Sequence, residues 1–195
     1  MPRSHFVNAP RPALYGVEKS RDKGRTHGLR STRDDINCLW RQIALNGKPS
    51  NNMLLDLLDE AFDKKSWHGP NLRGSIRGVT AKQAAWRPEG DRHNIWELTL
   101  HAAYWKYVVR RRLTGEMRGS FALRGSNFFA RPIEDTEAAW KADIVILLDE
   151  HRKLRSVVED LGAPSKEQAR QIRGVAAHDV YHAGQIRLLR RLCPL

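Results

Sequence analysis

The sequence predicts an all-α protein built as a bundle of four main amphipathic helices. Two patterns carry this prediction: apolar residues recur at spacings of three and four from about residue 50 onward, and no segment shows sustained strand alternation bounded by hairpin signals. Size agrees with it, because 195 residues with 41% hydrophobic side chains suit one domain with a single core.

Residues 1–50 differ from the remainder in composition. Prolines and glycines recur through this segment at a density that interrupts helices. Residues 1–52 hold 10 Lys+Arg against 4 Asp+Glu, which is +6 of the chain's net +12. We therefore expect a disordered or irregular basic arm at 1–50, with one short helix near 35–45, followed by a helical domain at 51–195.

Each expected helix of this domain has its own start and stop signals. The first carries apolar residues from Leu54 to Phe62 after a capping asparagine. Short helical turns follow near 72–76 and after Thr80. Three long helices complete the domain, and they span about residues 94–113, 135–161 and 165–193. Capping boxes are expected at three of these starts, namely Thr80 with Gln83, Asn94 with Glu97, and Ser165 with Gln168.

Histidines interrupt two of the expected apolar faces. On the last helix, His178 and His182 lie four residues apart on the face that also carries Val175 and Leu189. This is the spacing by which two imidazoles of one helix reach one metal ion. His101 borders an apolar face of the 94–113 helix and supplies a third ligand if the two helices face each other. Three imidazoles leave an open coordination position, as in catalytic metal sites.

Spacing alone leaves other interpretations open, because two histidines recur four apart by chance and a histidine beside a core is usually a satisfied polar residue. His151 is a further ligand, a hydrogen-bond partner of a ligand, or a residue at the core edge; the last two are favoured because it has no partner at helical spacing. Asp179 either accepts a hydrogen bond from a histidine ring or is a polar residue beside the stripe. Gln185 orients a bound water or substrate amide, or bridges two helices. Tyr104 lines the opening or packs against other aromatic rings.

Two stretches resemble signatures of the DinB-like superfamily: residues 174–186 (GVAAHDVYHAGQI) and residues 93–105 (HNIWELTLHAAYW). The resemblance covers about residues 53–193. It implies a four-helix bundle in up-down-down-up order, with His101, His178 and His182 as ligands of a divalent metal ion. It also implies likeness to the fold of transferases and isomerases that use low-molecular-weight thiols.

The resulting functional prediction is a metal-dependent hydrolase or small-thiol-dependent transferase that acts on a small molecule. Imidazole ligands leave the metal open among Zn, Ni, Fe and Mn. The alternative is a non-catalytic metal-binding bundle in a stress response. The motifs contain no evident nucleophile and assign no general base.

The predicted partners follow from charge, cysteine content and hydropathy. A basic chain without zinc-finger spacing or an RNP-like strand gives little support for nucleic acid as a partner. No apolar run approaches a membrane span, and two distant cysteines form no disulfide framework, so we expect a cytoplasmic protein. A homodimer through exposed helix faces is also expected. Arginines 110, 111, 112 and 118 form either a solvated helix end or the mouth of a site for an anionic ligand.

Overall fold

The computed structural model describes residues 51–194. The predicted arm at 1–50 lies outside this range, as does its expected helix near 35–45. The described residues are all-helical and contain no strand, which confirms the predicted all-α class. The helices are α2 (Asn51–Phe62), α3 (Leu72–Ile76), α4 (Ala81–Ala85), α5 (Ile95–Thr114), α6 (Glu137–Asp160) and α7 (Lys166–Leu192).

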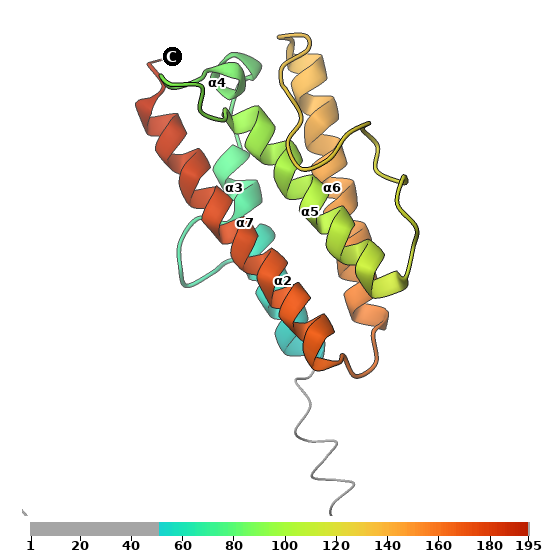
Figure 1. The fold of residues 1–195 in the computed structure, drawn as a ribbon. Helices are drawn as coiled ribbons and strands as arrows, with labels where there is room; N and C mark the ends of the chain where they lie inside the picture. The colour runs from blue at the N-terminus through green and yellow to red at the C-terminus, as the bar shows by residue number, and fades with distance from the viewer. Residues whose placement is uncertain (1–50, 195) are drawn as a thin grey trace, which may run out of the picture. The chain divides into compact units, whose positions relative to one another are not determined.

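The helices α2, α5, α6 and α7 form a bundle in which each of them contacts two of the others. Helix α5 contacts α6 and α7, and α2 contacts the same two helices from the other side. Figure 1 shows these helices lying lengthwise along each other, while the short α3 packs against α7 and the short α4 against α5 and α6. None of the described helices is long and apolar enough to span a lipid bilayer.

Most helix starts follow the signals in the sequence. Thr80 with Gln83 and Ser165 with Gln168 form the two predicted capping boxes at α4 and α7. The box predicted at Asn94 is only half formed. The Asn94 side chain accepts from the Glu97 amide at 2.8 Å, but the Glu97 carboxylate bonds Arg87 and His93 instead of returning to the Asn94 amide. The ion pair between Arg87 and Glu97 therefore replaces the local contact that a capping box requires.

The core consists of two apolar clusters with polar residues between them. One cluster surrounds Trp96 and Trp140, and the other surrounds Leu58 and Ile172. Along α5, α6 and α7 the boundary between the clusters carries buried polar side chains: Lys106, Glu150, His151, Asp179 and His182. Burying such groups is costly unless they find partners, so this layer is where a functional site is expected.

Candidate metal centre

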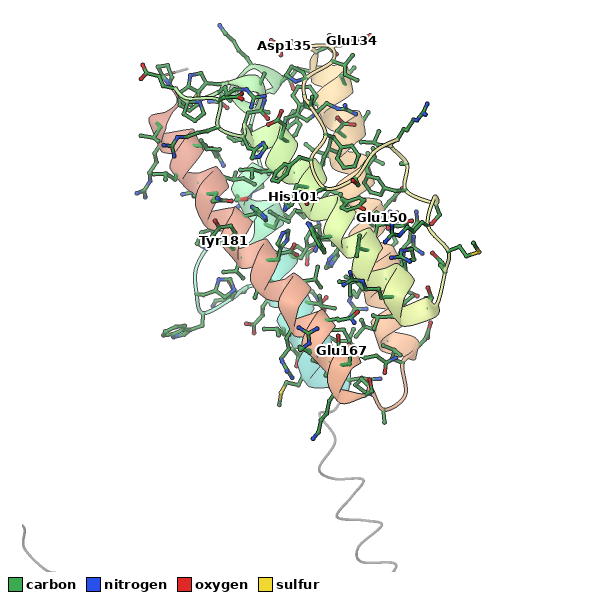
Figure 2. All side chains as sticks on the ribbon, in the orientation of Figure 1. His101, Glu134, Asp135, Glu150, Glu167 and Tyr181 are labelled. Atoms are coloured by element: carbon green, nitrogen blue, oxygen red, sulfur yellow. The ribbon has the colours of Figure 1, made fainter. Side chains whose placement is uncertain are left out.

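Three histidines meet where α5 faces α7. His101 comes from α5, and His178 and His182 lie one turn apart on α7. The Nε2 atom of His178 is 3.1 Å from Nε2 of His101 and 3.0 Å from Nε2 of His182. Figure 2 labels His101 on the side of α5 that looks toward α7. The predicted convergence of these three rings is therefore confirmed, and their nitrogen atoms could hold one metal ion.

The His101 ring is fixed by stacking as well as by its helix. It lies parallel to the Phe128 ring at a centroid distance of 3.9 Å, and His93 stacks on the opposite face of that ring at 3.7 Å. Trp105 and His178 approach it edge-on or tilted. The resulting sandwich of His93, Phe128 and His101 sets the plane of the imidazole before any ligand binds.

Hydrogen bonds at the outer nitrogens set the tautomers of two of the rings. Nδ1 of His101 is 3.0 Å from the backbone carbonyl oxygen of Asn127, which can only accept, so the ring proton lies on Nδ1. Nδ1 of His182 is 2.6 Å from Oε1 of Gln185, whose amide nitrogen donates in turn to the Tyr181 hydroxyl at 3.2 Å. Both rings therefore direct an Nε2 lone pair toward Nε2 of His178.

No placement of ring protons satisfies all three Nε2 atoms that meet here. His178 can offer at most one proton from Nε2, so one of the two facing lone pairs always meets another electron-rich nitrogen. Nδ1 of His178 is buried and has no hydrogen-bond partner among the described residues. Three convergent imidazole nitrogens form a donor set that suits a divalent transition-metal ion, so the residues fit such an ion.

Burial keeps all three imidazoles neutral at physiological pH. Desolvation lowers the pKa of His101 to about 4, with the hydrogen bond to Asn127 opposing it and the neighbouring His182 adding to it. Desolvation and the two neighbouring histidines lower the pKa of His178 to about 3. The pKa of His182 is also lowered, chiefly by burial. Neutral imidazole is the form that binds metals.

Two cavities reach the histidines from different sides. The larger, about 710 Å³, is lined mainly by apolar side chains such as Phe128 and Leu189, together with all three histidines. The smaller, about 420 Å³, is lined by His101 and His178 together with Trp105 and two arginines. A small molecule therefore has room beside the histidines on either side.

The other residues that the sequence suggested for the site differ in how they lie relative to the three histidines. Gln185 contacts His182, as described above. Asp179 forms a fully buried ion pair with Lys106 instead of the considered bond to a histidine ring; burial raises its carboxyl pKa and Lys106 opposes this. His151 stacks on Phe62 at 3.6 Å, outside the three-histidine group, and burial lowers its pKa to about 2.

Tyr104 packs among aromatic rings, including Phe121 and Phe129, and lines neither cavity at the histidines. Trp105 lies half-buried beside the centre. His68 is exposed and lies outside the group, while His5 and His27 lie outside the described residues.

The residues that sequence reasoning missed lie in the connection between α5 and α6. Asn127 adopts a left-handed conformation (φ 64°), which turns its carbonyl toward His101 while its side-chain oxygen accepts from Trp105 Nε1 at 3.1 Å. Asparagine tolerates this conformation better than most residues, so a turn at Asn127 is readable from the sequence. The contact of the turn with His101 is not.

The fold and the site together define an all-α protein with a three-histidine cluster between two of its long helices. A sequence model of the DinB superfamily matches residues 66–186, which is more than half of the chain and includes all three histidines. The chain belongs to the DinB superfamily. Neither the curated proteins nor the solved structures contain a match to this chain.

Proposed function

We propose that this protein is a divalent-metal-dependent enzyme whose metal ligands are His101, His178 and His182. The observation that carries the proposal is the pair of Nε2 lone pairs directed at His178 Nε2. When bound, a divalent ion supplies Lewis-acid chemistry, because it lowers the pKa of a water or thiol that it holds. The reaction class is hydrolysis or transfer from a small thiol. The metal remains one of Zn, Ni, Fe or Mn.

The chain's own residues prepare the site for this chemistry. Asn127 and Gln185 hold the outer nitrogens of two ligand rings, as hydrogen-bonding partners of metal-bound histidines do. The described lining of both cavities includes no cysteine, serine, aspartate or glutamate. A nucleophile therefore comes from water or from a thiol co-substrate, in agreement with the two reaction classes.

His93 is the general base of this proposal. It lines the larger cavity with the three histidines, and its Nδ1 is 2.9 Å from Glu97 Oε2. Burial opposes ionisation of Glu97, but hydrogen bonds from Arg87 and His93 lower its pKa to about 2, so it remains a carboxylate. Nδ1 of His93 then donates to Glu97, and Nε2 is left to take the proton from the attacking water or thiol.

Three further expectations belong to the proposal. The four long helices run up, down, down and up; this is supported by Figure 1, in which the connection after α5 returns along that helix before α6 begins. The protein is a homodimer in the cytoplasm, as the sequence predicts.

The alternative to an enzyme is a stress-response bundle that binds metal without turnover.

Elemental analysis of the purified full-length protein tests the metal site. We expect one divalent ion per chain in the wild type, and its loss in each of the variants His101→Ala, His178→Ala and His182→Ala. His68→Ala is the matched control, because His68 is exposed and outside the cluster. Retention of the ion in any of the three cluster variants contradicts the ligand assignment.

Turnover separates the enzyme from the non-catalytic alternative. Metal-loaded protein should convert a small ester or thiol-transfer probe, and chelation should abolish the conversion. His93→Gln should keep its metal, lower kcat, and remove the limb of the pH–rate profile that reports the base. Equal kcat values and pH profiles for His93→Gln and wild type would assign the base elsewhere.

A further inference from the structure

A second hollow lies away from the histidines. It has a volume of about 730 Å³ and lies between the C-terminal half of α5 and the connection of residues 115–127. Tyr104, Tyr107 and Phe121 pack against one another along it. None of the three histidines lines it, and its size is that of a pocket for a drug-sized ligand.

The charged side chains that line this hollow are all positive. Arg111, Arg112, Arg118 and Arg124 all line it, and the described lining contains no aspartate or glutamate. A cleft lined by charges of one sign concentrates ions of the opposite sign. The hollow therefore favours an anion.

None of the four arginines that line the hollow pairs with a carboxylate among the described residues, whereas several arginines elsewhere in the domain do. Arg87, Arg131 and Arg155 each pair with a carboxylate, and so does Arg110 next to the hollow, which binds Glu116. By contrast, no hydrogen bond or ion pair joins Arg112, Arg118 or Arg124 to another described residue.

Arg111 adds a buried donor to this set. Its Nε atom is buried without a hydrogen-bond partner, and its Nη1 reaches only a backbone oxygen of Glu116 at 3.4 Å. A buried donor of this kind calls for a partner from outside the described residues.

A tyrosine at the edge of the hollow is hydrogen-bonded to the connection. Burial alone raises the pKa of Tyr107, yet hydrogen bonds from Gly119 and Ser120 and the nearby Arg111 lower it overall. The Gly119 amide donates to the Tyr107 hydroxyl at 3.1 Å, which holds the connection against α5 and closes one wall of the hollow.

We propose that this hollow is a binding site for an organic polyanion, a molecule that carries at least two phosphate or carboxylate charges on a planar body. The arginines contact the anionic groups, because guanidinium matches phosphate and carboxylate oxygens in paired hydrogen bonds. The aromatic wall receives the planar body, as in stacking of bases on aromatic side chains. The site does not depend on the metal centre.

The hollow nevertheless adjoins that centre. Trp105, Arg112 and Asn127 line both the hollow and the smaller cavity at His101. The residue whose carbonyl holds His101 is thus also a wall of the anion site. A ligand bound in the hollow touches the segment that positions one of the proposed metal ligands.

Calorimetric titration of the full-length protein tests the proposal, with ATP, tripolyphosphate and adenosine as probes in the absence of added metal. We expect saturable one-to-one binding of ATP, at least tenfold weaker binding of tripolyphosphate, and no measurable binding of adenosine. The double variant Arg118→Gln/Arg124→Gln should bind ATP at least tenfold more weakly than wild type.

Two controls make the outcome decisive. Arg173→Gln/Arg187→Gln removes the same charge from exposed positions of α7 outside the hollow, and it should bind ATP as the wild type does. His178→Ala should also bind ATP normally. Equal weakening by both double variants would mean that binding reflects overall charge, and loss in His178→Ala would place the anion on the metal site. Either result overturns the proposal, as does unchanged binding in Arg118→Gln/Arg124→Gln.

Discussion

Gln185 shows how a single side chain prepares a proposed metal ligand, His182. Its Oε1 accepts from His182 Nδ1 and so fixes the proton away from the centre. Gln185→Leu removes this acceptor, and we expect the affinity for Zn²⁺ to fall by about tenfold or more, as for other partners of metal-bound histidines. Competition with a chromophoric chelator measures the change.

Gln185→Glu is the matched variant, because a carboxylate keeps the acceptor in the same position. We expect it to bind Zn²⁺ at least as tightly as wild type. Wild-type affinity in Gln185→Leu would show that the His182 tautomer needs no partner.

His151 makes the fold sensitive to acid. Its pKa is about 2 in the folded protein against an ordinary 6.5, so between these values the unfolded chain binds a proton that the folded chain does not. The free energy of unfolding therefore falls as the pH falls below about 6, by about 1 kcal/mol per pH unit from this group. His151→Phe keeps a ring against Phe62 and should remove that contribution. Urea unfolding of both proteins at pH 7 and pH 5 measures the difference.

The same variant tests which residues belong to the proposed metal site. His151 lies outside the three-histidine group, so His151→Phe should keep the wild-type metal content. An equal pH slope in the two proteins would mean that His151 takes up its proton in the folded state as readily as in the unfolded state.

At the scale of single residues, the sequence predicts the three clustered histidines better than the residues that contact them. His178 and His182 are readable because helical spacing places both on one face, and His101 because it borders an apolar face of another helix. The contacts of Asn127 and Phe128 with His101 are not readable, because both residues lie in a connection without periodicity and reach His101 only through the tertiary fold.

Helices α5 and α7 are joined by a buried ion pair between Lys106 and Asp179. Both side chains are fully buried, so removal of one leaves the other charged and unpaired in the core. We expect Lys106→Met to lower the free energy of unfolding by about 3–5 kcal/mol, measured by guanidinium denaturation. The double variant Lys106→Met/Asp179→Leu should regain most of that loss, because no charge remains unpaired.

A double variant as unstable as Lys106→Met alone would contradict this account. It would show that packing of the whole Lys106 side chain, whose Nζ lies 4.8 Å from the centroid of the Phe62 ring, matters more than the charge pair. The metal content of the double variant then reports whether the pair also sets the position of α5 against α7.

The helix boundaries show where local signals suffice. The three long helices begin and end within two residues of the predicted positions. Their caps are local, since Ser165 bonds a residue three positions away. The error at Asn94 arises because Glu97 has a stronger partner in Arg87, ten positions earlier, and no local pattern reveals that competition.

At the scale of the molecule, the predicted arm should be dispensable. A chain of residues 51–195 should melt at the temperature of the full chain and keep its metal content, as calorimetry and elemental analysis would show. A chain that begins at Met53 should be less stable, by about 1 kcal/mol. It lacks Asn51, whose side-chain nitrogen donates to the Leu161 carbonyl at 2.7 Å and ties α2 to the end of α6.

A lower melting temperature for 51–195 than for the full chain would refute the domain boundary. Equal melting temperatures for the chains starting at residues 51 and 53 would mean that water replaces the Asn51 contact without loss.

The layered core is the part of the architecture that hydropathy predicts least. Apolar stripes indicate which helices pack, but a charged residue such as Lys106 in mid-helix reads as solvent-exposed from composition alone. It is fully buried because Asp179 faces it from another helix. Pairings of this kind depend on the register between helices, which one sequence does not reveal.

The hydrogen bond from His101 to the Asn127 carbonyl limits which mutations this protein can accept at and near residue 127. A main-chain oxygen holds His101, so exchanging the side chain at this position does not by itself delete the contact. The contact depends instead on the backbone conformation at residue 127. A β-branched residue or proline at this left-handed position, or a one-residue insertion nearby, would carry the carbonyl away from the ring. Substitution by residues that adopt the left-handed conformation, such as glycine or aspartate, is tolerated here, whereas β-branched residues, proline and a change of loop length are not.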